Sequence, residues 1–347
     1  MNFRTAFNRL VDMVSERERV RNKTQAINSS GSEISTLTRV AIVLRWLGGG
    51  SYLDICFAFG VAPGSFYHED GVLWGTMKLI DECFVIGFPF DDYSELTRIS
   101  KEFSEFCYGR MTDCVLAIDG WVCRTRQPFD YEAQFPSLYR NRHECFGIVI
   151  LAGCDAKTKF LMWSCKSTGS TNDVLAWEFC NFKTLLDNGK LPFKFYVIGD
   201  EAFVCTNQFL VPWSGRGLDP WKDSFNFHLS AMRQCIERAF ALLVQRWGIF
   251  WRTLKCSYDK WTLVCTVAAK LHNFCIDMNE GTEKDILERH NDDWEDGDNP
   301  TVLVNSDEND ISRARPSGNT RINITQYLEA QGYRRPTYAA RNSRVPT

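Results

Sequence analysis

The sequence of 347 residues shows neither the long apolar run of a membrane-spanning helix nor the apolar segment of a secretory signal. No stretch of about 18 consecutive apolar residues occurs, so we expect no membrane-spanning helix. The first twenty residues, MNFRTAFNRLVDMVSERERV, lack the continuous apolar segment of a secretory signal and are typical of a short amphipathic helix. The chain is nevertheless 44% hydrophobic and contains 25 phenylalanines, which is enough for a substantial core and excludes a largely disordered protein.

The 14 cysteines include no CxxC pair. Structural zinc sites usually need such close pairs with Cys or His partners, so a zinc site is disfavoured. The cysteines stand singly, mostly within apolar runs, and unpaired Cys is among the residue types most often buried. We therefore expect buried, reduced thiols and a reducing compartment, the cytosol or the nucleus.

Charge is unevenly distributed along the chain. The net charge of −3 gives no sign of nucleic-acid binding by itself. Between residues 283 and 310, however, eleven acidic residues oppose two basic ones, and between 313 and 344 seven arginines oppose one glutamate. The acidic segment is either a solvated linker or a mimic of DNA that shields a basic face.

The pattern divides the chain into four regions. Residues 1–37 contain an N-terminal helix and a polar linker. Residues 38–110 read as short helices separated by glycine-containing turns, which fits a helix-turn-helix-like module or a small all-α bundle that packs on the rest. Residues 111–280 alternate between strands and helices. Residues 281–347, an acidic linker and a basic tail, are low in apolar residues, so we predict that they are disordered.

The region 111–280 predicts an α/β fold. A short apolar run ends at Asp119, and a hairpin follows with strands at 145–153 and 160–167. A helix, a buried strand that ends at Asp200 and a long helix that carries Glu237 complete the pattern. This order gives a mixed sheet flanked by helices, which is the order of an RNase H-like fold.

Three acidic residues are candidates for a metal site. Asp119 and Asp200 each follow an apolar strand, and Glu237 could reach them from the long helix. Such carboxylates can hold two divalent cations about 3.5–4 Å apart for phosphodiester chemistry. Each residue also has a plain structural alternative. The two aspartates could form turns, and Glu237 could pair with Arg233 four residues earlier on one helix face.

Three further residues compete for roles near this site. Asp173, in the sequence STND, is the alternative to Asp200 as metal ligand, but we expect it to stand apart as a helix cap. Asp155 falls in the predicted hairpin turn and His272 on an apolar helix. We interpret both as structural residues.

Basic residues near the proposed site are candidates for DNA contacts, because Arg and Lys that touch phosphates position a duplex. The candidates are Arg124, Arg126, Arg140, Arg142, His143, Arg216 and Lys222. The last two flank a loop with Trp213 and Trp221, which either stack on splayed bases or anchor the loop on the core.

Several of these segments together resemble a known family. They are AIDG at 117–120, YRNRH at 139–143, GSTND at 169–173, IGDEAF at 198–203, FNFHLSAMRQCIERAF at 225–240, VQRW at 244–247 and AAKLHNFC at 268–275. Over about residues 38 to 278 the chain resembles the PIF/Harbinger-type DDE transposases and their domesticated relatives. Asp119, Asp200 and Glu237 match the three acidic residues of that family. His143 stands where the family usually has Lys, which puts one phosphate or target contact in doubt.

The resemblance implies a transposase-like endonuclease and strand transferase that acts on double-stranded, terminal-inverted-repeat DNA. It further implies a nuclear location and a Myb-like helper protein, and a homo-oligomer is compatible with it. Oxygen ligands without Cys or His favour two Mg²⁺ or Mn²⁺ ions. The alternatives are a domesticated, non-cleaving factor that binds DNA or protein, and an unrelated metallohydrolase that acts on phosphomonoesters.

Overall fold

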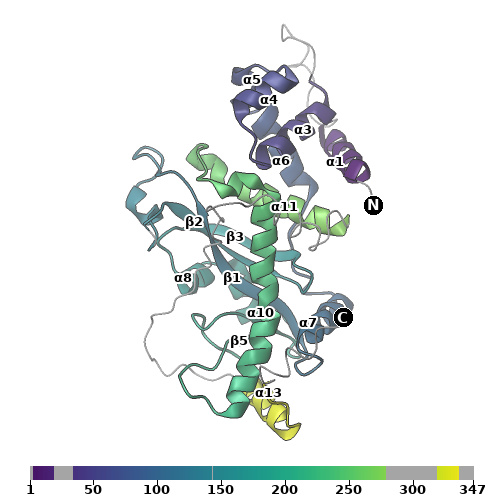
Figure 1. Cartoon of the computed structure of the whole chain (residues 1–347), viewed down its shortest axis with the longest axis vertical. Coiled ribbons are helices and arrows are strands. Elements are labelled where there is room, and N and C mark those ends of the chain that lie inside the picture. The colour runs from purple at the N-terminus through teal and green to yellow at the C-terminus, as the bar shows by residue number, and fades with distance from the viewer. Residues whose placement is uncertain (1–2, 19–33, 143, 279–318, 336–347) are drawn as a thin grey trace, which may run out of the picture.

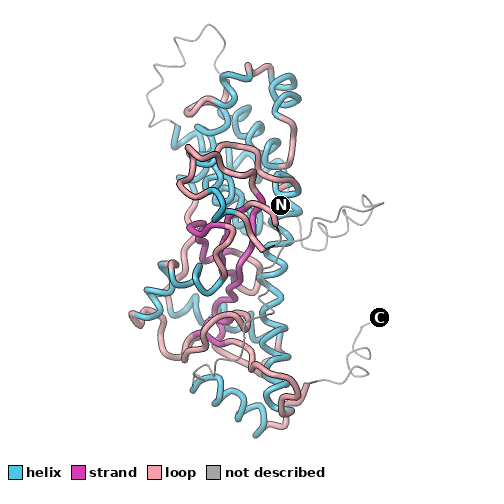
Figure 2. The backbone as a smooth tube through the Cα atoms, turned by 90° about the vertical axis from the view of Figure 1, so that its left-hand side faces the viewer, coloured by secondary structure: helices cyan, strands magenta, loops and turns pink. Residues whose placement is uncertain are grey.

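The computed structural model describes residues 3–18, 34–142, 144–278 and 319–335. The molecule is elongated, with a group of short helices at one end and a sheet with a long helix in the remainder (Figure 1). Seen after a quarter turn, the strands occupy the middle of the molecule (Figure 2). Within the described ranges, no helix is both long and apolar enough to cross a membrane.

Short helices joined by tight turns form the first part of the chain. They are α1 (Phe3–Glu18), α3 (Thr36–Leu47), α4 (Tyr52–Phe59), α5 (Pro63–Tyr67), α6 (Val72–Cys83) and α7 (Tyr93–Phe106). The Ser35 side chain caps α3, and Gly60 follows α4 with φ 66°, a left-handed conformation that suits glycine. Helix α6 is buried along most of its length and contacts α1, α3 and α5.

Within the described part of the chain, five strands form one mixed sheet in the order β3-β2-β1-β4-β5. They are β1 (Cys114–Arg124), β2 (Gly147–Cys154), β3 (Phe160–Thr168), β4 (Tyr196–Ile198) and β5 (Phe209–Leu210). The first three pair antiparallel, whereas β1–β4 and β4–β5 pair parallel. The structure confirms the predicted hairpin of β2 and β3. The sequence did not predict β5, because two residues are too few to show a period.

Strand β1 is longer than the sequence suggested. We expected it to end at Asp119, but it continues to Arg124 because β2 pairs with it as far as Gly147. On its other side, the pairing with β4 stops at Ala117, opposite Ile198. Asp119 therefore lies within β1 at the point where β1 has lost its second neighbour.

The long helix α10 (Pro220–Arg246) lies along the sheet and crosses it in Figure 1. The Asp219 side chain accepts hydrogen bonds from two backbone N–H groups of the first turn, and proline occupies the first helical position. Buried residues of one face contact β1 and β2, and the ring of Phe240 lies 5.8 Å from that of Trp121 on β1. This packing fixes α10 against the strand that carries Asp119.

The segment between β3 and β4 contains two helices, α8 (Asp173–Glu178) and α9 (Asn181–Asp187), where we predicted one. Residues five positions apart on a straight helix point about 140° apart. The break allows Trp177 and Phe182 to meet, with ring centroids 6.2 Å apart, and both are buried. The need to bury both rings therefore explains the break.

Helix α11 (Trp261–Asp277) joins the sheet to the short helices. Lys260, directly before it, forms an ion pair with Glu69 at 2.6 Å, and Lys270 pairs with Asp81 at the same distance. Both lysines are largely buried as side chains. Partly buried pairs are screened less by salt than exposed ones, so these contacts help to hold the short helices on α11.

The expectation of disorder for residues 281–347 was wrong for part of that region. Residues 319–330 form α13, which packs on α10 near the bottom of Figure 1. The guanidinium of Arg321 lies 3.9 Å from the centroid of the Trp213 ring and donates to the carbonyl oxygens of Val211 and Pro212. Arg321 thus anchors a segment that is otherwise poor in apolar residues. The acidic stretch 283–310 lies outside the described residues.

The 14 cysteines all lie within the described residues, and none of them forms a disulfide. Two pairs approach closely in the core: Cys154 and Cys235, and Cys123 and Cys265, each with sulfur atoms 3.6 Å apart. Burial raises the pKa of Cys154 and Cys265 well above the usual value of a thiol. The predicted buried, unpaired thiols are confirmed for most of the cysteines, and five are partly exposed.

His272 is a core residue, as the sequence indicated. Its Nε2 donates to the Thr158 carbonyl oxygen at 2.9 Å, and its Nδ1 accepts from Arg246 at 2.9 Å. Burial and the neighbouring Arg246 lower the pKa of His272 from 6.5 to about 3.

The folded state should therefore lose stability as the pH falls below 6.5, because the unfolded chain then binds a proton at His272 that the folded chain does not. At pH 5 this contribution amounts to about 2 kcal/mol. Urea unfolding of the wild type and of His272→Gln at pH 7.5 and pH 5 should show the smaller acid loss in the variant. Equal losses in both proteins would contradict this assignment.

Candidate metal centre

The Asp119 side chain is buried in the middle of β1, with no exposed surface. Its Oδ1 accepts from the Gly120 N–H at 2.9 Å, and its Oδ2 accepts from Arg233 of α10 at 3.1 Å. The β1–β4 pairing ends at Ala117, opposite Ile198, so Asp200, which follows β4, lies close to this position along β1.

Asp200 follows β4 and is 9% exposed. Its Oδ1 accepts from the backbone N–H of Ala202 at 2.9 Å, which fixes the side chain in a turn. Gly199 precedes it, and an added Cβ there would lie 2.6 Å from the Phe209 ring and 2.8 Å from the Phe203 ring. These two rings close the end of β4 and so determine the direction in which Asp200 leaves the sheet.

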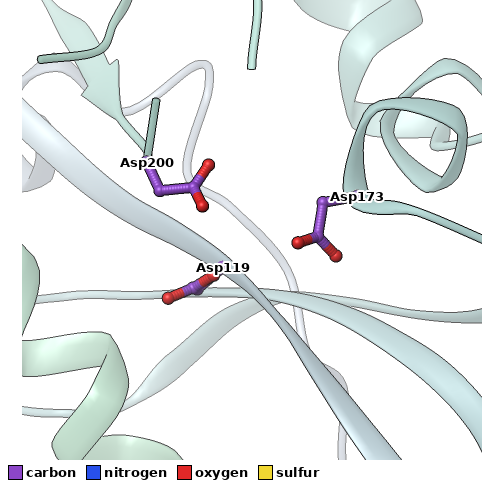
Figure 3. Close-up of side chains that lie close together, drawn as sticks. All are labelled: Asp119, Asp173 and Asp200. Atoms are coloured by element: carbon purple, nitrogen blue, oxygen red, sulfur yellow. The ribbon is translucent and has the colours of Figure 1, made fainter. Parts of the chain in front are cut away.

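Asp173 does not stand apart as a helix cap, and that prediction was wrong. Asn172 is the cap of α8, because its side-chain oxygen accepts from the Leu175 N–H at 2.9 Å. Asp173, the next residue, is fully buried and faces the two other aspartates (Figure 3). The sequence Asn172-Asp173 offers two residues that can cap a helix, so the sequence alone did not decide which one would do so.

Gly120 makes room for Asp173. An added Cβ at Gly120 would overlap Oδ1 of Asp173. Any side chain larger than hydrogen would therefore push the carboxylate away from Asp119. One signal for this role was visible in the sequence, the glycine directly after the aspartate in AIDG.

Asp119, Asp173 and Asp200 converge, and one carboxylate oxygen from each lies within 4.8 Å of those of the other two. Figure 3 shows the three carboxylates around a common space, from a strand, a helix start and a strand end. Oxygens bound to one Mg²⁺ ion lie about 3.0–4.2 Å apart, since each bond is about 2.1 Å. The three carboxylates would therefore draw closer together on binding such an ion.

The electrostatics of the cluster favour a bound cation. Burial raises the pKa of Asp119 to about 6, Arg233 opposes this rise, and the nearby Asp200 adds to it. Three buried carboxylates repel one another, and Arg233 supplies one positive charge against them. Hard oxygen donors of this kind suit Mg²⁺ or Mn²⁺ and do not form the nitrogen–sulfur set of a structural zinc site.

Glu237 is placed differently from the three aspartates. It lies on α10, its side chain is 48% exposed, and it pairs with Arg233 at 3.5 Å. The same Arg233 nitrogen contacts Asp119, so the guanidinium stands between Glu237 and the cluster. The ion pair that we regarded as the plain alternative for Glu237 therefore forms. Arg233 itself was missed as a site residue, although its four-residue spacing from Glu237 was visible.

The residues that we predicted to contact DNA lie in several environments. Arg124, Arg142 and Arg216 are exposed, and Arg140 is exposed beside Glu144 at 3.6 Å. Arg126 instead forms an ion pair with Glu132 at 2.5 Å. Lys222 pairs with Asp219 at 3.0 Å. His143 lies outside the described residues.

Trp213 anchors its loop, in agreement with one of the two alternatives. Its indole N–H donates to Thr325 of α13 at 3.0 Å, and cations from Lys222 and Arg321 lie over its ring. The Arg334 guanidinium lies 5.1 Å from the centroid of the Trp221 ring. Asp155 accepts from the backbone N–H groups of Lys157 and Lys159 in the hairpin turn, so its structural interpretation is confirmed.

The region that contains this cluster is similar to a known family. A family model described as DDE superfamily endonuclease matches residues 118–273. The match includes the three clustered aspartates, Arg233 and Glu237. No curated protein and no solved structure matches the chain. The match supports a transposase-like nuclease domain, and the buried acidic cluster fits the divalent metals that this superfamily usually uses.

Divalent metal should stabilise the folded protein, because the cluster is assembled in the folded chain alone. At a Mn²⁺ concentration a hundred times the dissociation constant, the gain is about 2.7 kcal/mol. We expect Gly120→Ala to lose most of this gain, since the new methyl group displaces Asp173. Thermal unfolding with and without Mn²⁺ measures the effect.

Gly64→Ala is the matched control, because an added Cβ at Gly64 meets no atom within 4 Å. This variant should keep the full response to Mn²⁺. If Gly120→Ala responds to Mn²⁺ as the wild type does, Asp173 is not a ligand in the arrangement described.

Proposed function

We propose that the chain is a metal-dependent DNA endonuclease that cleaves phosphodiester bonds at the aspartate cluster. One observation carries the proposal: Asp119, Asp173 and Asp200 converge within the segment matched by the DDE superfamily endonuclease model. Their burial adds weight, because three carboxylates removed from water destabilise a protein that has no cation to bind there.

The arrangement of the sheet supports a finer proposal, an RNase H-like domain of the PIF/Harbinger type. An antiparallel meander β1-β2-β3 is extended by two parallel strands beside β1, and α10 packs along the sheet. On this proposal the substrate is terminal-inverted-repeat DNA, and strand transfer follows cleavage. The motifs quoted for the resemblance support this choice.

The aspartates of the cluster and the residues around them would have distinct roles in the reaction. Bound divalent cations, Mg²⁺ or Mn²⁺, would supply activation of the attacking oxygen and neutralisation of charge at the leaving oxygen. Asp119, Asp173 and Asp200 would hold them. Arg233 keeps the Asp119 carboxylate oriented through its 3.1 Å contact. Gly120 keeps the space beside the Asp173 carboxylate free of another side chain.

Glu237 keeps its proposed role in a second metal site. A two-metal site places its ions about 3.5–4 Å apart, and one acidic residue on α10 could complete the second ion's ligands. Arg233 now bridges Glu237 and Asp119, so that role requires Arg233 to move aside. We propose that Glu237 and Asp119 would hold a second cation once Arg233 no longer occupies its present contacts with them.

Exposed arginines are available to contact the phosphates of the DNA backbone. Arg124 ends β1, and Arg140 and Arg142 lie in the connection between β1 and β2. Arg216 lies on the exposed loop before α10. Such contacts fix the position of a duplex without reading its sequence. Arg126 is a poorer candidate because Glu132 neutralises it.

The charge of the short helices does not support a DNA-reading helix-turn-helix. Between Arg45 and Lys78 the sequence contains no Lys or Arg, although phosphate contacts need them. Helix α4 instead exposes Leu53 and Phe57, which are 57% and 91% exposed. We propose this apolar face as the contact for a protein partner, such as the Myb-like helper or a second copy, in the nucleus.

Loss of any clustered carboxylate should abolish metal-dependent cleavage. We expect Asp119→Asn, Asp173→Asn and Asp200→Asn each to reduce the cleavage rate by more than about 100-fold, the upper end of the loss when a residue that only supports a metal ligand is removed. DNA affinity without metal should stay equal or rise, because each change removes a negative charge near phosphates. Cleavage of labelled end DNA and anisotropy binding measure the two effects.

Asp187→Asn, a change in an exposed residue of α9, serves as the control and should cleave as the wild type does. Glu237→Gln tests the second ion separately, and wild-type cleavage by this variant would remove Glu237 from the site. Wild-type cleavage by Asp119→Asn would remove the aspartate cluster from the reaction. DNA binding without metal-dependent cleavage in the wild type would favour the rival proposal, a domesticated factor that binds without cutting.

A further inference from the structure

The connection between β1 and β2 exposes two aromatic rings that the aspartate cluster does not use. Phe129 is 52% exposed and Tyr131 is 83% exposed. Their rings are stacked, with an interplanar angle of 13° and centroids 5.3 Å apart. Exposed aromatic side chains held side by side are unusual on a monomer surface and are typical of binding sites.

These rings are the outer part of a column of flat groups. The Arg126 guanidinium lies 4.5 Å from the centroid of the Phe129 ring and 5.9 Å from that of Trp261. Trp261 is 1% exposed, so the column begins in the core and ends at the open face of Tyr131. Cation–π contacts of this kind add to the stability of the stack.

Hydrogen bonds fix the turn that carries the rings. Arg126 forms two hydrogen bonds with the Glu132 carboxylate, at 2.7 and 2.5 Å. The Phe129 N–H donates to Glu132 Oε2 at 2.8 Å, and the Glu132 N–H donates to the Phe129 carbonyl at 2.9 Å. The backbone of the turn is therefore fixed before any ligand binds, which lowers the entropy lost on binding.

The column is connected to the segment that carries Asp173. The Ser170 N–H donates to the Leu138 carbonyl oxygen at 2.9 Å, three residues before Asp173. The hydroxyl groups of Tyr139 and Tyr258 lie 2.7 Å apart, and the Tyr258 N–H donates to Glu132 Oε1 at 3.4 Å. In Figure 1 the connection between β1 and β2 lies above α8.

The connection between β1 and β2 exposes both basic and acidic side chains, which favour different parts of a ligand. Arg140 and Arg142 are exposed and can meet phosphates. Asp130, between the two stacked rings in sequence, is also exposed and repels a phosphate there. The column thus favours a flat, uncharged group, while the arginines favour the backbone that carries it. A nucleobase on a phosphate backbone has this combination.

We infer that the column Trp261–Arg126–Phe129–Tyr131 binds an unpaired nucleobase of the DNA. A base inside a duplex already stacks on both faces, so a base that has left the helix is the form that offers a free face to Tyr131. The inference rests on the proposed nuclease function and adds the form of DNA that the protein holds. One unpaired base stacks on Tyr131 while the backbone reaches the aspartate cluster.

The test uses the full chain without divalent metal, so that no cleavage occurs. The probes are a duplex with one bulged 2-aminopurine, whose fluorescence falls on stacking, and the same duplex fully paired. The wild type should bind the bulged duplex more tightly and quench its fluorescence. Tyr131→Ala should weaken binding of the bulged duplex about tenfold, leave the paired duplex unchanged and abolish the quenching.

Two variants serve as controls. Tyr131→Phe keeps the ring and should behave as the wild type, and so should Phe193→Ala, which removes another exposed ring, 97% exposed, before β4. Because Tyr131 is largely exposed, substitutions at this position should not change the thermal unfolding midpoint of the protein. Wild-type preference for the bulged duplex in Tyr131→Ala, or no such preference in the wild type, would overturn the inference.

Cleavage of the same two duplexes with Mg²⁺ separates this inference from the proposed function. Cleavage without any preference for the bulged duplex keeps the nuclease function and overturns the stacking site. Ring-dependent binding without cleavage supports the stacking site and counts against the nuclease. Absence of both binding and cleavage overturns both.

Discussion

The burial of the Asp119 carboxylate in the middle of β1 constrains every neighbour of that side chain. A carboxylate without solvent needs compensating partners, and here it has the Gly120 N–H and the Arg233 guanidinium. The two other aspartates approach it from positions that leave no room for a larger side chain at Gly120. The early end of β4 and the packing of α10 on β1 place Asp200 and Arg233 beside this carboxylate.

Much of the fold was predictable, because long periodic segments show their structure in the sequence. The hairpin of β2 and β3 and the long helix α10 belong to this class. The missed elements depend on contacts distant in sequence. Strand β1 extends to Arg124 because β2 pairs with it, and α13 is ordered because Arg321 docks on Trp213. Amino-acid composition alone does not show that Arg321 packs on Trp213.

The sequence predicted the acidic chemistry of the site, but it did not predict all of the residues that form it. Apolar strands that end near Asp119 and Asp200 indicated an acidic cluster, and the structure brings these two together. Asp173 was misjudged because Asn172 and Asp173 are equally able to cap α8. Which of them does so depends on the burial of Asp173 beside Asp119 and Asp200, which are distant from it in sequence. Glu237 has a partner on its own helix, so its spacing from Arg233 fits a surface ion pair as well as a metal ligand.

The close thiol pairs of the core have a practical consequence. Cys154 of β2 faces Cys235 of α10, and Cys123 of β1 faces Cys265 of α11. Thiol reagents need access to the sulfur atom, and burial denies it to all four. Burial also raises the pKa of Cys154 and Cys265, which disfavours their reactive thiolate forms. Alkylation at these four positions therefore reports separation of the helices from the sheet, residue by residue. The native chain thus carries its own chemical probe of opening, with no label added.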